Sequence, residues 1–503
     1  MPFNSIFSWL IKKRIHQIDL FKQYPFEVQE ELRLKLVESA KNTVWAKQHH
    51  FSAIKNYQDF QQAIPLQEYT SLLPFIQREM DGETNVLWPK KTNWFAKSSG
   101  TTNAKSKFIP VTKDSLEGCH YKGGKDLLAL YYNNHPKRKL YNGKYLVIGG
   151  SAQINQLNPA SYLGDLSAII VKNLPFWAEI RRTPSKEIAL MNEWESKLEK
   201  MARSTMNEDV FIIVGVPSWT MILAKKVLEI SGKSNLKEVW PNLELFMHGG
   251  VSFEPYKHEF QRLIPDKKMN YVETYNASEG FFGIQDQLDS NELLLMLDYG
   301  IYCEFIPMDS FDGVNSKEVC NLENVVLHKN YALVISSNGG LWRYIIGDTI
   351  QFTNLKPFRI KITGRTKHYI NTFGEELIVD NAEKAITHAC EQTNSQLKEF
   401  TAGPIYMQEG QKGGHEWLIE FTKAPENIAL FGSLLDEKLC AVNSDYAAKR
   451  VANLVLQAPI IQQLPEGTFY EWLKSKGKLG GQNKVPRLSN NRLIIEEVIA
   501  IFA

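Results

Sequence analysis

Three short apolar runs, each separated from the next by a helix-length stretch, constrain the fold of this chain most strongly. They are KYLVIGG, DVFIIVGV and LELFMHGGV, at 144–150, 209–216 and 243–251. Strands of a parallel sheet are covered by helices on both faces, so they read as continuous apolar runs rather than as alternating ones. The pattern therefore predicts buried parallel strands joined by crossover helices.

The pattern of predicted secondary structure differs in the other parts of the chain. The first ninety residues read mainly as helix, because leucines and valines are interleaved with charges there. From residue 292 onward we expect hairpins, with turns at 298–300 and 338–340. A composition shift near Gly364 then leads into about 140 residues of mixed strand and helix. The prediction is an α/β fold with two domains, at 1–363 and 364–503.

Composition excludes several classes of protein. Hydrophobic residues make up 43% of the 503 residues and charged residues 23%, which is ordinary for a globular protein. The net charge of +2 provides no overall field that would attract nucleic acid or membrane. The chain has no apolar run long enough to span a bilayer, and its first apolar cluster precedes its positive charges, the reverse of a secretory signal. We expect a soluble protein with neither nucleic-acid nor membrane partners.

The number and spacing of the five cysteines indicate a reducing compartment. They are widely scattered, odd in number and contain no CxxC pair. This spacing argues against a disulfide framework and against a structural zinc site. We therefore expect free thiols in a reducing cytoplasm.

The sharpest local motif is FAKSSGTTNAKSKFIP, at 95–110. Small residues let a backbone approach an anion closely, and the two lysines that follow add charge suited to phosphate. It is not a Walker A loop, because that motif needs a second glycine before its lysine. A polar surface loop between two strands would have the same composition. The candidate phosphate-binding residues are Ser98, Ser99, Gly100, Thr101 and Thr102.

A second motif is YVETYNASEGFFGIQ, at 271–285, in which Glu279 lies between aromatic, strand-like flanks. A buried carboxylate must be paired, protonated or bound to a metal. Mg²⁺ shared with phosphate oxygens would suit it, and the aromatic rings could flank a planar base. A solvated turn with ordinary core packing explains the same residues.

Two further stretches carry single charged candidates. In LWRYIIGDTIQF, at 341–352, Asp348 is expected at the end of a hydrophobic hairpin strand, where it could accept both hydroxyls of a ribose. A turn aspartate is the common alternative. In GGQNKVPRLSNNR, at 480–492, Lys484 and Arg487 lie in a loop punctuated by Gly, Asn and Pro, which alone would be read as solvated.

In this order and spacing, the motifs resemble those of the acyl acid amido synthetases of the auxin-responsive Gretchen Hagen family, within the luciferase-like adenylate-forming superfamily. SSGTTNAKSKFIP resembles the phosphate loop of that family, YNASEG its nucleotide motif and WRYIIGD its ribose motif. GRTKHYINTFGEEL resembles the hinge, and NKVPR the C-terminal lysine motif. Ala104 and Trp342 depart from the residues most frequent in the family. Neither change removes a charge.

The resemblance implies a large N-terminal α/β domain with a β-barrel-like part and a smaller, mobile C-terminal α+β domain. It implies that a carboxylic acid and ATP form an acyl-adenylate and pyrophosphate, and that an amino acid amine then displaces AMP. Ser98 to Thr102 would hold the phosphates, and Glu279 would face Mg²⁺. Lys484 would come to the α-phosphate from the C-terminal domain. The nucleotide would also be bound by Tyr275, Ser278, Asp348 and Arg365.

The acid would bind between the helix that follows Pro110 and the stretch 216–227. Candidate contacts there are Tyr121, Gly124, Trp219 and Thr220, for which core packing is the alternative. Two other functions remain open at this point. An acid–thiol ligase would transfer the same adenylate to CoA, and a non-catalytic member would bind nucleotide alone.

Overall fold

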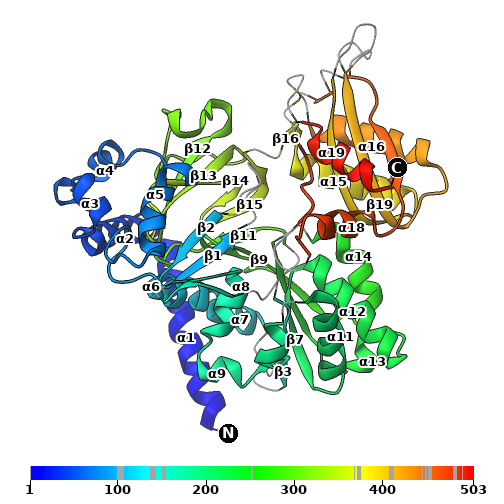
Figure 1. The fold of residues 1–503 in the computed structure, drawn as a ribbon, viewed down its shortest axis with the longest axis horizontal. Coiled ribbons are helices and arrows are strands. Elements are labelled where there is room, and N and C mark those ends of the chain that lie inside the picture. Colours follow the sequence, from blue (N-terminus) through cyan, green and yellow to red (C-terminus); the bar gives the residue numbers. More distant parts are fainter. Residues whose placement is uncertain are drawn as a thin grey trace. The chain divides into compact units, whose positions relative to one another are not determined.

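The computed structural model describes residues 2–502 except 99–106, 136–142, 150–153, 160, 192, 251–252, 289, 367–368, 371–374, 376, 407–412, 444–445, 448–449, 451–455, 480–483 and 490. The chain forms two compact units (Figure 1). Unit 1 comprises Met1–Val251, Ile264–Ile346 and Ile350–Lys361, and unit 2 comprises Ser252–Leu263, Gly347–Thr349 and Ile362–Ala503. The main division thus falls at residue 361.

Unit 1 begins with helices, as predicted for the first ninety residues. Pro25 opens α2 in a position where its missing N–H costs nothing, and Asn56 forms a reciprocal capping box with Asp59 at the start of α4. Helix α2 packs against two strands of the large sheet, β12 (Ile301–Pro307) and β13 (Asn330–Ser337), beside which it lies in Figure 1. The helices of this part are α1 (Pro2–Gln23), α2 (Pro25–Ala40), α3 (Val44–Gln48), α4 (Tyr57–Ala63) and α5 (Tyr69–Met80).

The large sheet of the described chain has the order β12-β13-β14-β15-β11-β10-β9-β8-β7-β3-β6. Its remaining strands are β3 (Lys144–Val147), β6 (Arg182–Thr183), β7 (Val210–Gly215), β8 (Leu245–Gly249), β9 (Asn270–Ala277), β10 (Gly280–Ile284), β11 (Leu293–Leu295), β14 (Tyr344–Leu355) and β15 (Phe358–Arg365). Strands β3, β7, β8 and β9 are parallel neighbours. The three apolar runs are β3, β7 and β8, so the prediction of parallel strands is confirmed. Strand β8 is almost entirely buried, whereas in β3 only Leu146 is buried.

Helices make the crossovers between these parallel strands, as the spacing predicted. Between β3 and β7 lie α8 (Leu166–Lys172), α9 (Phe176–Glu179), α10 (Lys186–Ala189) and α11 (Trp194–Thr205). Helices α12 (Pro217–Ser231) and α13 (Leu236–Val239) join β7 to β8, and α14 (Glu254–Leu263) follows β8. Leu245 and Phe246 of β8 and Ile212 of β7 are completely buried, because parallel strands are covered on both faces.

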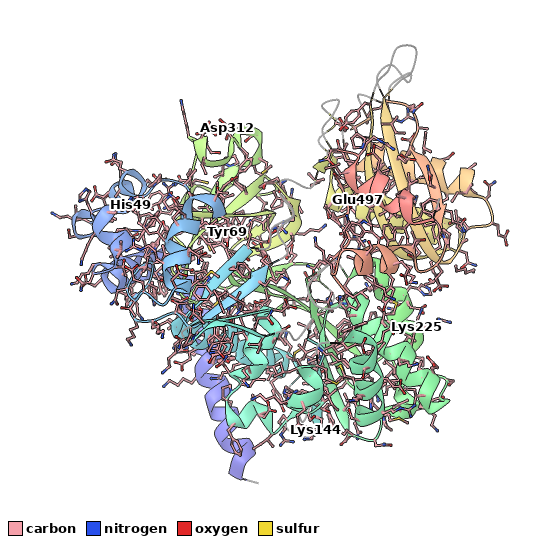
Figure 2. The ribbon with its side chains drawn as sticks, viewed as in Figure 1. His49, Tyr69, Lys144, Lys225, Asp312 and Glu497 are labelled. Atoms are coloured by element: carbon pink, nitrogen blue, oxygen red, sulfur yellow. The ribbon has the colours of Figure 1, made fainter. Side chains whose placement is uncertain are left out.

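A smaller sheet with the order β2-β1-β5-β4 carries the ends of the first motif. Its strands are β1 (Trp94–Ser98), β2 (Lys107–Val111), β4 (Asn155–Asn158) and β5 (Ser161–Gly164). Ser98 pairs with Lys107 across the antiparallel β1–β2 ladder, so the two strands flank residues 99–106 in the sequence. Tyr69 of α5, labelled in Figure 2, accepts a hydrogen bond from Phe108 N at 2.8 Å and so fixes the start of β2.

Two expectations about the segment 292–355 are wrong. Strands β11 and β12 flank the predicted turn at 298–300, but β11 pairs with β10 and β15, whereas β12 pairs with β13. Asp348 does not end a strand, because β14 continues to Leu355. The turn at 338–340 is confirmed, since β13 and β14 are neighbours and Ser337 N donates to Leu341 O at 2.8 Å.

Unit 2 has its own core. Its sheets have the orders β18-β19-β20 and β16-β17. Phe400, Trp417 and Phe431 are completely buried in one apolar cluster of this unit. The elements after residue 366 are β16 (Tyr369–Ile370), β17 (Leu377–Ile378), α15 (Val379–Gln392), β18 (Gln396–Ile405), β19 (Gly414–Lys423), α16 (Ile428–Val442), β20 (Ile460–Leu464), α18 (Thr468–Ser475) and α19 (Leu493–Phe502).

The cysteines and helices agree with the sequence in two further respects. All five cysteines carry free thiols. Within the described ranges, no helix has the length and apolar content needed to cross a bilayer. The fold class is confirmed as mixed α/β, with a large N-terminal domain and a smaller C-terminal one.

Candidate active site

The carboxyl ends of the parallel strands assemble one group of candidate residues. In the register of the sheet, Gly215 of β7 pairs with His248 of β8, and Gly249 pairs with Thr274 of β9. Ligands of open α/β sheets bind at this edge, because the loops that follow the strands meet there. The first turn of α12 and the β9–β10 turn therefore lie at the same edge of the sheet.

Ser278 and Glu279 form the tight turn between β9 and β10, since Ala277 pairs with Gly280. Ser278 is buried, and its Oγ has no hydrogen-bond partner among the described residues. Burying a hydroxyl without a hydrogen-bond partner costs free energy. A ligand group that forms a hydrogen bond with the Ser278 Oγ would offset that cost. Glu279 is half-buried beside it. Tyr275 is buried and packs on Phe282, with ring centroids 4.8 Å apart.

The helix expected after Pro110 is interrupted. A short α6 (Lys113–Ser115) passes into a π-helical turn at Leu116–His120 before α7 (Tyr121–Asn134) begins. Such turns recur at functional sites, and nothing in the sequence indicated this one. The turn places Cys119 Sγ 3.1 Å from Phe281 N and His120 Nδ1 3.2 Å from Asn276 Oδ1.

The π-helical turn thus joins the start of α7 to the β9–β10 hairpin. Burial lowers the pKa of His120 to about 4, although its bond to Asn276 opposes this. The imidazole is therefore neutral at physiological pH. Gly123 of α7 packs against the Phe281 ring so closely that an added Cβ would lie 2.5 Å from it. A glycine is needed there to bring the helix against the strand.

The four candidate acid-pocket residues have different surroundings. The hydroxyl of Tyr121 lies 3.4 Å from the backbone oxygen of Ile170, and an added Cβ at Gly124 would meet open space. Trp219 is buried against Trp194 of α11, with centroids 4.6 Å apart at 73°. Trp219 Nε1 and the buried Thr220 Oγ1 have no hydrogen-bond partner within the described ranges. Core packing accounts for the Trp219 ring, but not for these two polar atoms.

Of the five candidate phosphate-binding residues, Ser98 belongs to the described part of the chain. It ends β1 and is half-buried. Ser99, Gly100, Thr101 and Thr102 lie outside the described part of the chain. Lys107 begins β2, with its ammonium 5.8 Å from the Tyr69 ring and 5.9 Å from the Tyr344 ring.

Unit 2 carries the other group of candidates. Asp348 and Arg365 form an ion pair, with Oδ1 and Nε 3.1 Å apart. Gly347, immediately before Asp348 in β14, has φ +89°, a conformation that L side chains rarely adopt. Asp348 and Arg365 also act on the pKa of Lys484, so the charges of three motifs that are distant in sequence influence one another.

Lys484 is exposed over the residue as a whole, whereas its ammonium end is surrounded by protein. Burial first and then the Arg365 guanidinium lower the pKa of Lys484 to about 8, whereas Asp348 and Glu383 raise it. A lysine with this pKa is mostly protonated at pH 7 and loses its charge in mildly alkaline solution.

The arginine of WRYIIGD, Arg343, has a structural role in this chain. Arg343 is buried, with Nε 2.9 Å from Glu304 Oε2 and Nη1 2.8 Å from Ile64 O. Its backbone has φ +40°. Sequence reasoning had no means of finding Glu304, because the pair joins β12 to the residue that precedes β14.

No group of three or more His, Cys, Asp or Glu in the described chain could hold a metal by itself. A Mg²⁺ ion that accompanies a nucleotide needs only one or two protein carboxylates, because phosphates and waters complete its shell. The single carboxylate of Glu279 beside the unpartnered Ser278 Oγ fits that kind of site.

The fold is shared with adenylate-forming ligases. It matches 2-hydroxyisobutyryl-CoA ligase, solved in the postadenylation state with 2-HIB-AMP, at a TM-score of 0.59 and 12% identity, covering 94% of this chain and 91% of that one. It matches the GH3.15 acyl acid amido synthetase at a TM-score of 0.78 and 17% identity, covering 94% and 93%.

The family is shown by the sequence models. The GH3 family N-terminal domain matches residues 14–269, the central domain 294–365 and the C-terminal domain 380–493. The chain therefore belongs to the GH3 family. It is 22% identical to the indole-3-acetic acid-amido synthetase GH3.4 of Arabidopsis thaliana, covering 94% of this chain and 91% of that protein. It is also 22% identical to the jasmonoyl–L-amino acid synthetase JAR4 of Nicotiana attenuata, covering 94% and 92%.

Proposed function

We propose that this chain is an ATP-dependent acyl acid amido synthetase that joins a small carboxylic acid to an amino acid. In the first step, a carboxylate oxygen bonds to the α-phosphorus of ATP and pyrophosphate leaves. In the second, the amino acid nitrogen bonds to the acyl carbon, AMP leaves with the electron pair, and the amine gives up a proton. Such chemistry needs charge neutralisation and alignment rather than a strong base.

One observation carries the proposal: residues of the ribose, hinge and lysine motifs converge in unit 2. Asp348 contacts Arg365, and both shift the pKa of Lys484. If the three motifs were only a surface turn, a strand end and a solvated loop, nothing would require their charged residues to lie close together. Asp348 accepts the ribose hydroxyls, Arg365 lies beside the nucleotide, and Lys484 places its charge against the α-phosphate and the attacking carboxylate.

Residues of unit 1 have the remaining roles in this proposal. Ser98 to Thr102 hold the phosphates, and Tyr275 and Ser278 contact the nucleotide. The unpartnered Ser278 Oγ supports a ligand contact. Glu279 would hold Mg²⁺, which neutralises phosphate charge when it is bound. The acid lies near Tyr121, Gly124, Trp219 and Thr220. Two buried polar atoms there, Trp219 Nε1 and Thr220 Oγ1, have no hydrogen-bond partner among the described residues.

The proposal includes two statements about the whole protein. The segment 364–503 acts as a mobile domain that carries Lys484, separate from 1–363. The enzyme works in the cytoplasm, which the five free thiols support.

The test is ATP–pyrophosphate exchange with a panel of aryl, indolyl and aliphatic acids. Each active acid is then incubated with ATP and pooled amino acids or with CoA, and the products are identified by mass spectrometry. We expect acid-dependent exchange and an amide with AMP. A thioester as the sole product would make the chain a CoA ligase. Nucleotide binding without exchange for any acid would make it a non-catalytic member.

A further inference from the structure

Asn276 lies near the carboxyl end of β9, between Tyr275 and the turn that carries Ser278, and its side chain is exposed. Its Oδ1 lies 3.2 Å from Nδ1 of His120, a residue that is 5% exposed. Within the described part of the chain, His120 is the hydrogen-bond partner of this amide, and the amide Nδ2 makes no hydrogen bond. One end of the Asn276 amide is therefore held by the protein, and the other end is accessible to a ligand.

The two faces of β9 carry different candidates. Successive side chains of a strand point to opposite faces, so Asn276 and Tyr275 are on opposite sides of the sheet. Asn276 pairs with Phe281 across the β9–β10 ladder, which places both side chains on one face. That face is covered by α7, because an added Cβ at Gly123 would lie 2.5 Å from the Phe281 ring. Tyr275 packs on Phe282 on the other face.

The α7 face is the side on which the proposed function places the acid, since Tyr121 and Gly124 belong to that helix. The Tyr275 side is the one assigned to the nucleotide. Asn276 thus lies on the acid side, one residue away from a nucleotide contact. The reacting carboxylate of the acid has to come to this position, because it must meet the α-phosphate of the nucleotide.

The π-helical turn holds this pair of strands with two consecutive side chains. Cys119 Sγ lies 3.1 Å from Phe281 N, and His120 Nδ1 lies 3.2 Å from Asn276 Oδ1. Because Asn276 and Phe281 are ladder partners, the turn contacts the hairpin at a single register position, on both strands. The start of α7 and the Asn276 amide are therefore fixed relative to each other.

The protonation state of His120 determines how the amide is oriented. Burial lowers the pKa of His120 to about 4, so the neutral imidazole carries one N–H. The amide oxygen that faces it can only accept a hydrogen bond, so Nδ1–H donates to Oδ1. This bond keeps Nδ2, with its two N–H groups, on the side away from the imidazole. A group that can only donate binds acceptors, and a carboxylate is the strongest acceptor that the acid offers.

We propose that the Asn276 amide binds the carboxylate of the acyl acid through Nδ2, and that His120 is the positioning residue that orients this amide. The inference rests on the proposed function and adds to it a binding residue for the reacting end of the acid. It also gives the π-helical turn a role, since an interrupted helix brings His120 to the hairpin.

The test of Asn276 is the acid dependence of pyrophosphate exchange, with benzoate, indole-3-acetate and hexanoate as probes. Asn276→Ala should raise the KM of the most active probe at least tenfold. The kcat should stay within threefold and the ATP dissociation constant within twofold, because the lost contact involves the acid alone. Asn276→Asp should raise the acid KM further than Asn276→Ala does, because a carboxylate at this position repels that of the acid.

The test of His120 separates positioning from general support of the fold. His120→Phe keeps a ring but removes the donor, and it should raise the acid KM at least fivefold. His120→Asn should recover most of this loss, because its amide nitrogen comes close to the position of Nδ1. The double variant with Asn276→Ala should have the KM of Asn276→Ala within twofold. If His120 acted independently of the amide, the two losses would add.

Two variants of the same elements provide matched controls. Asn270 is at the other end of β9, with Nδ2 3.0 Å from the hydroxyl of Tyr131. His135 follows the last turn of α7, with Nδ1 3.1 Å from Tyr131 O. Asn270→Ala and His135→Phe each remove a comparable contact far along the element from the carboxyl edge. Both should keep the acid KM within twofold of wild type at a temperature where they are folded.

The outcomes distinguish this inference from the proposed function. Absence of exchange by the wild type with every acid defeats the proposed function, and this inference with it. Exchange by the wild type with an unchanged acid KM in Asn276→Ala and Asn276→Asp overturns the role of Asn276 alone. Weaker ATP binding in place of a raised acid KM also overturns it, because the amide would then contact the nucleotide.

A separate result decides the role of His120. Additive losses in the double variant, or no recovery in His120→Asn, would make His120 a structural residue. Should His120→Phe not fold, His120→Gln takes its place, because its amide nitrogen matches Nε2 rather than Nδ1. An acid KM equal to that of wild type in His120→Gln then contradicts the positioning role.

Discussion

The Arg365 guanidinium lies against the Asp348 carboxylate, with Nε 3.1 Å from Oδ1, where β15 runs beside β14. The carboxylate is mostly buried and the guanidinium is partly exposed. Because Asp348 also raises the pKa of Lys484, one carboxylate interacts with two cations from separate motifs. This small charge group is the part of unit 2 on which the proposed chemistry depends.

Replacing Asp348 tests the ribose contact. Hydrogen bonds to a charged group contribute about 1.5–3 kcal/mol, so Asp348→Ala should weaken ATP binding at least tenfold. Isothermal titration with folded protein measures this. Asp312→Ala is the control, because Asp312 is an exposed carboxylate of unit 1, labelled in Figure 2, and its loss should leave affinity unchanged. An unaltered dissociation constant in Asp348→Ala would rule out the ribose role.

Glu279→Gln tests the metal contact at the β9–β10 turn. The change keeps the shape of the side chain but removes the charge that draws Mg²⁺ to the phosphates. Pyrophosphate exchange at limiting Mg²⁺ should fall at least tenfold, and excess Mg²⁺ should restore part of it. A titration of exchange rate against Mg²⁺ concentration gives the shift. If the two titration curves coincide, Glu279 is only a turn residue.

Lys484→Ala tests the two half-reactions separately. Removing a preorganised charge of this kind costs about 2.7–4 kcal/mol, or a factor of 10²–10³ in rate. Acyl-adenylate formation should slow by that factor, with ATP affinity nearly intact. Amide formation from preformed acyl-adenylate should suffer much less, because domain rotation then removes the lysine. The exposed Lys478 provides the control variant Lys478→Ala. Equal losses in both half-reactions would show that Lys484 supports the fold instead.

The burial of Glu79 predicts that the free energy of unfolding depends on pH. Burial raises the pKa of this 1%-exposed carboxyl from 4.5 to about 7, against hydrogen bonds from Leu87 N, Trp88 N and Thr92. The folded protein then keeps a proton that the unfolded chain releases, so stability falls as pH rises from 4.5 to 7 and is level above 7. The loss amounts to about 3 kcal/mol.

Glu79→Gln should remove this slope. The apparent Tm of the wild type, measured from pH 5 to pH 8, should decline relative to that of the variant, and the gap should stop widening above pH 7. Parallel Tm curves for the two proteins would mean that Glu79 is ionised in the fold throughout that range.

Local pattern was sufficient for much of unit 1. Continuous apolar runs identified β3, β7 and β8, because strands buried on both faces need no polar residue. The β9–β10 turn at Ser278 and Glu279 followed from a polar pair between aromatic flanks. Order and spacing of the motifs also led to the family, which the sequence models confirm for residues 14–269, 294–365 and 380–493.

Local sequence was enough to assign most segments to helix or strand and to pick out their charged residues. The tertiary structure decided their partners. Leu293–Leu295 reads as a strand, but only the assembled sheet placed it between β10 and β15. The π-helical turn at Leu116–His120 and the meeting of Arg487 with Glu383 and Glu399 left no local signal. The reason is physical. An apolar or charged side chain is stabilised by whichever neighbour the folded chain places against it, and a short sequence pattern does not specify that neighbour.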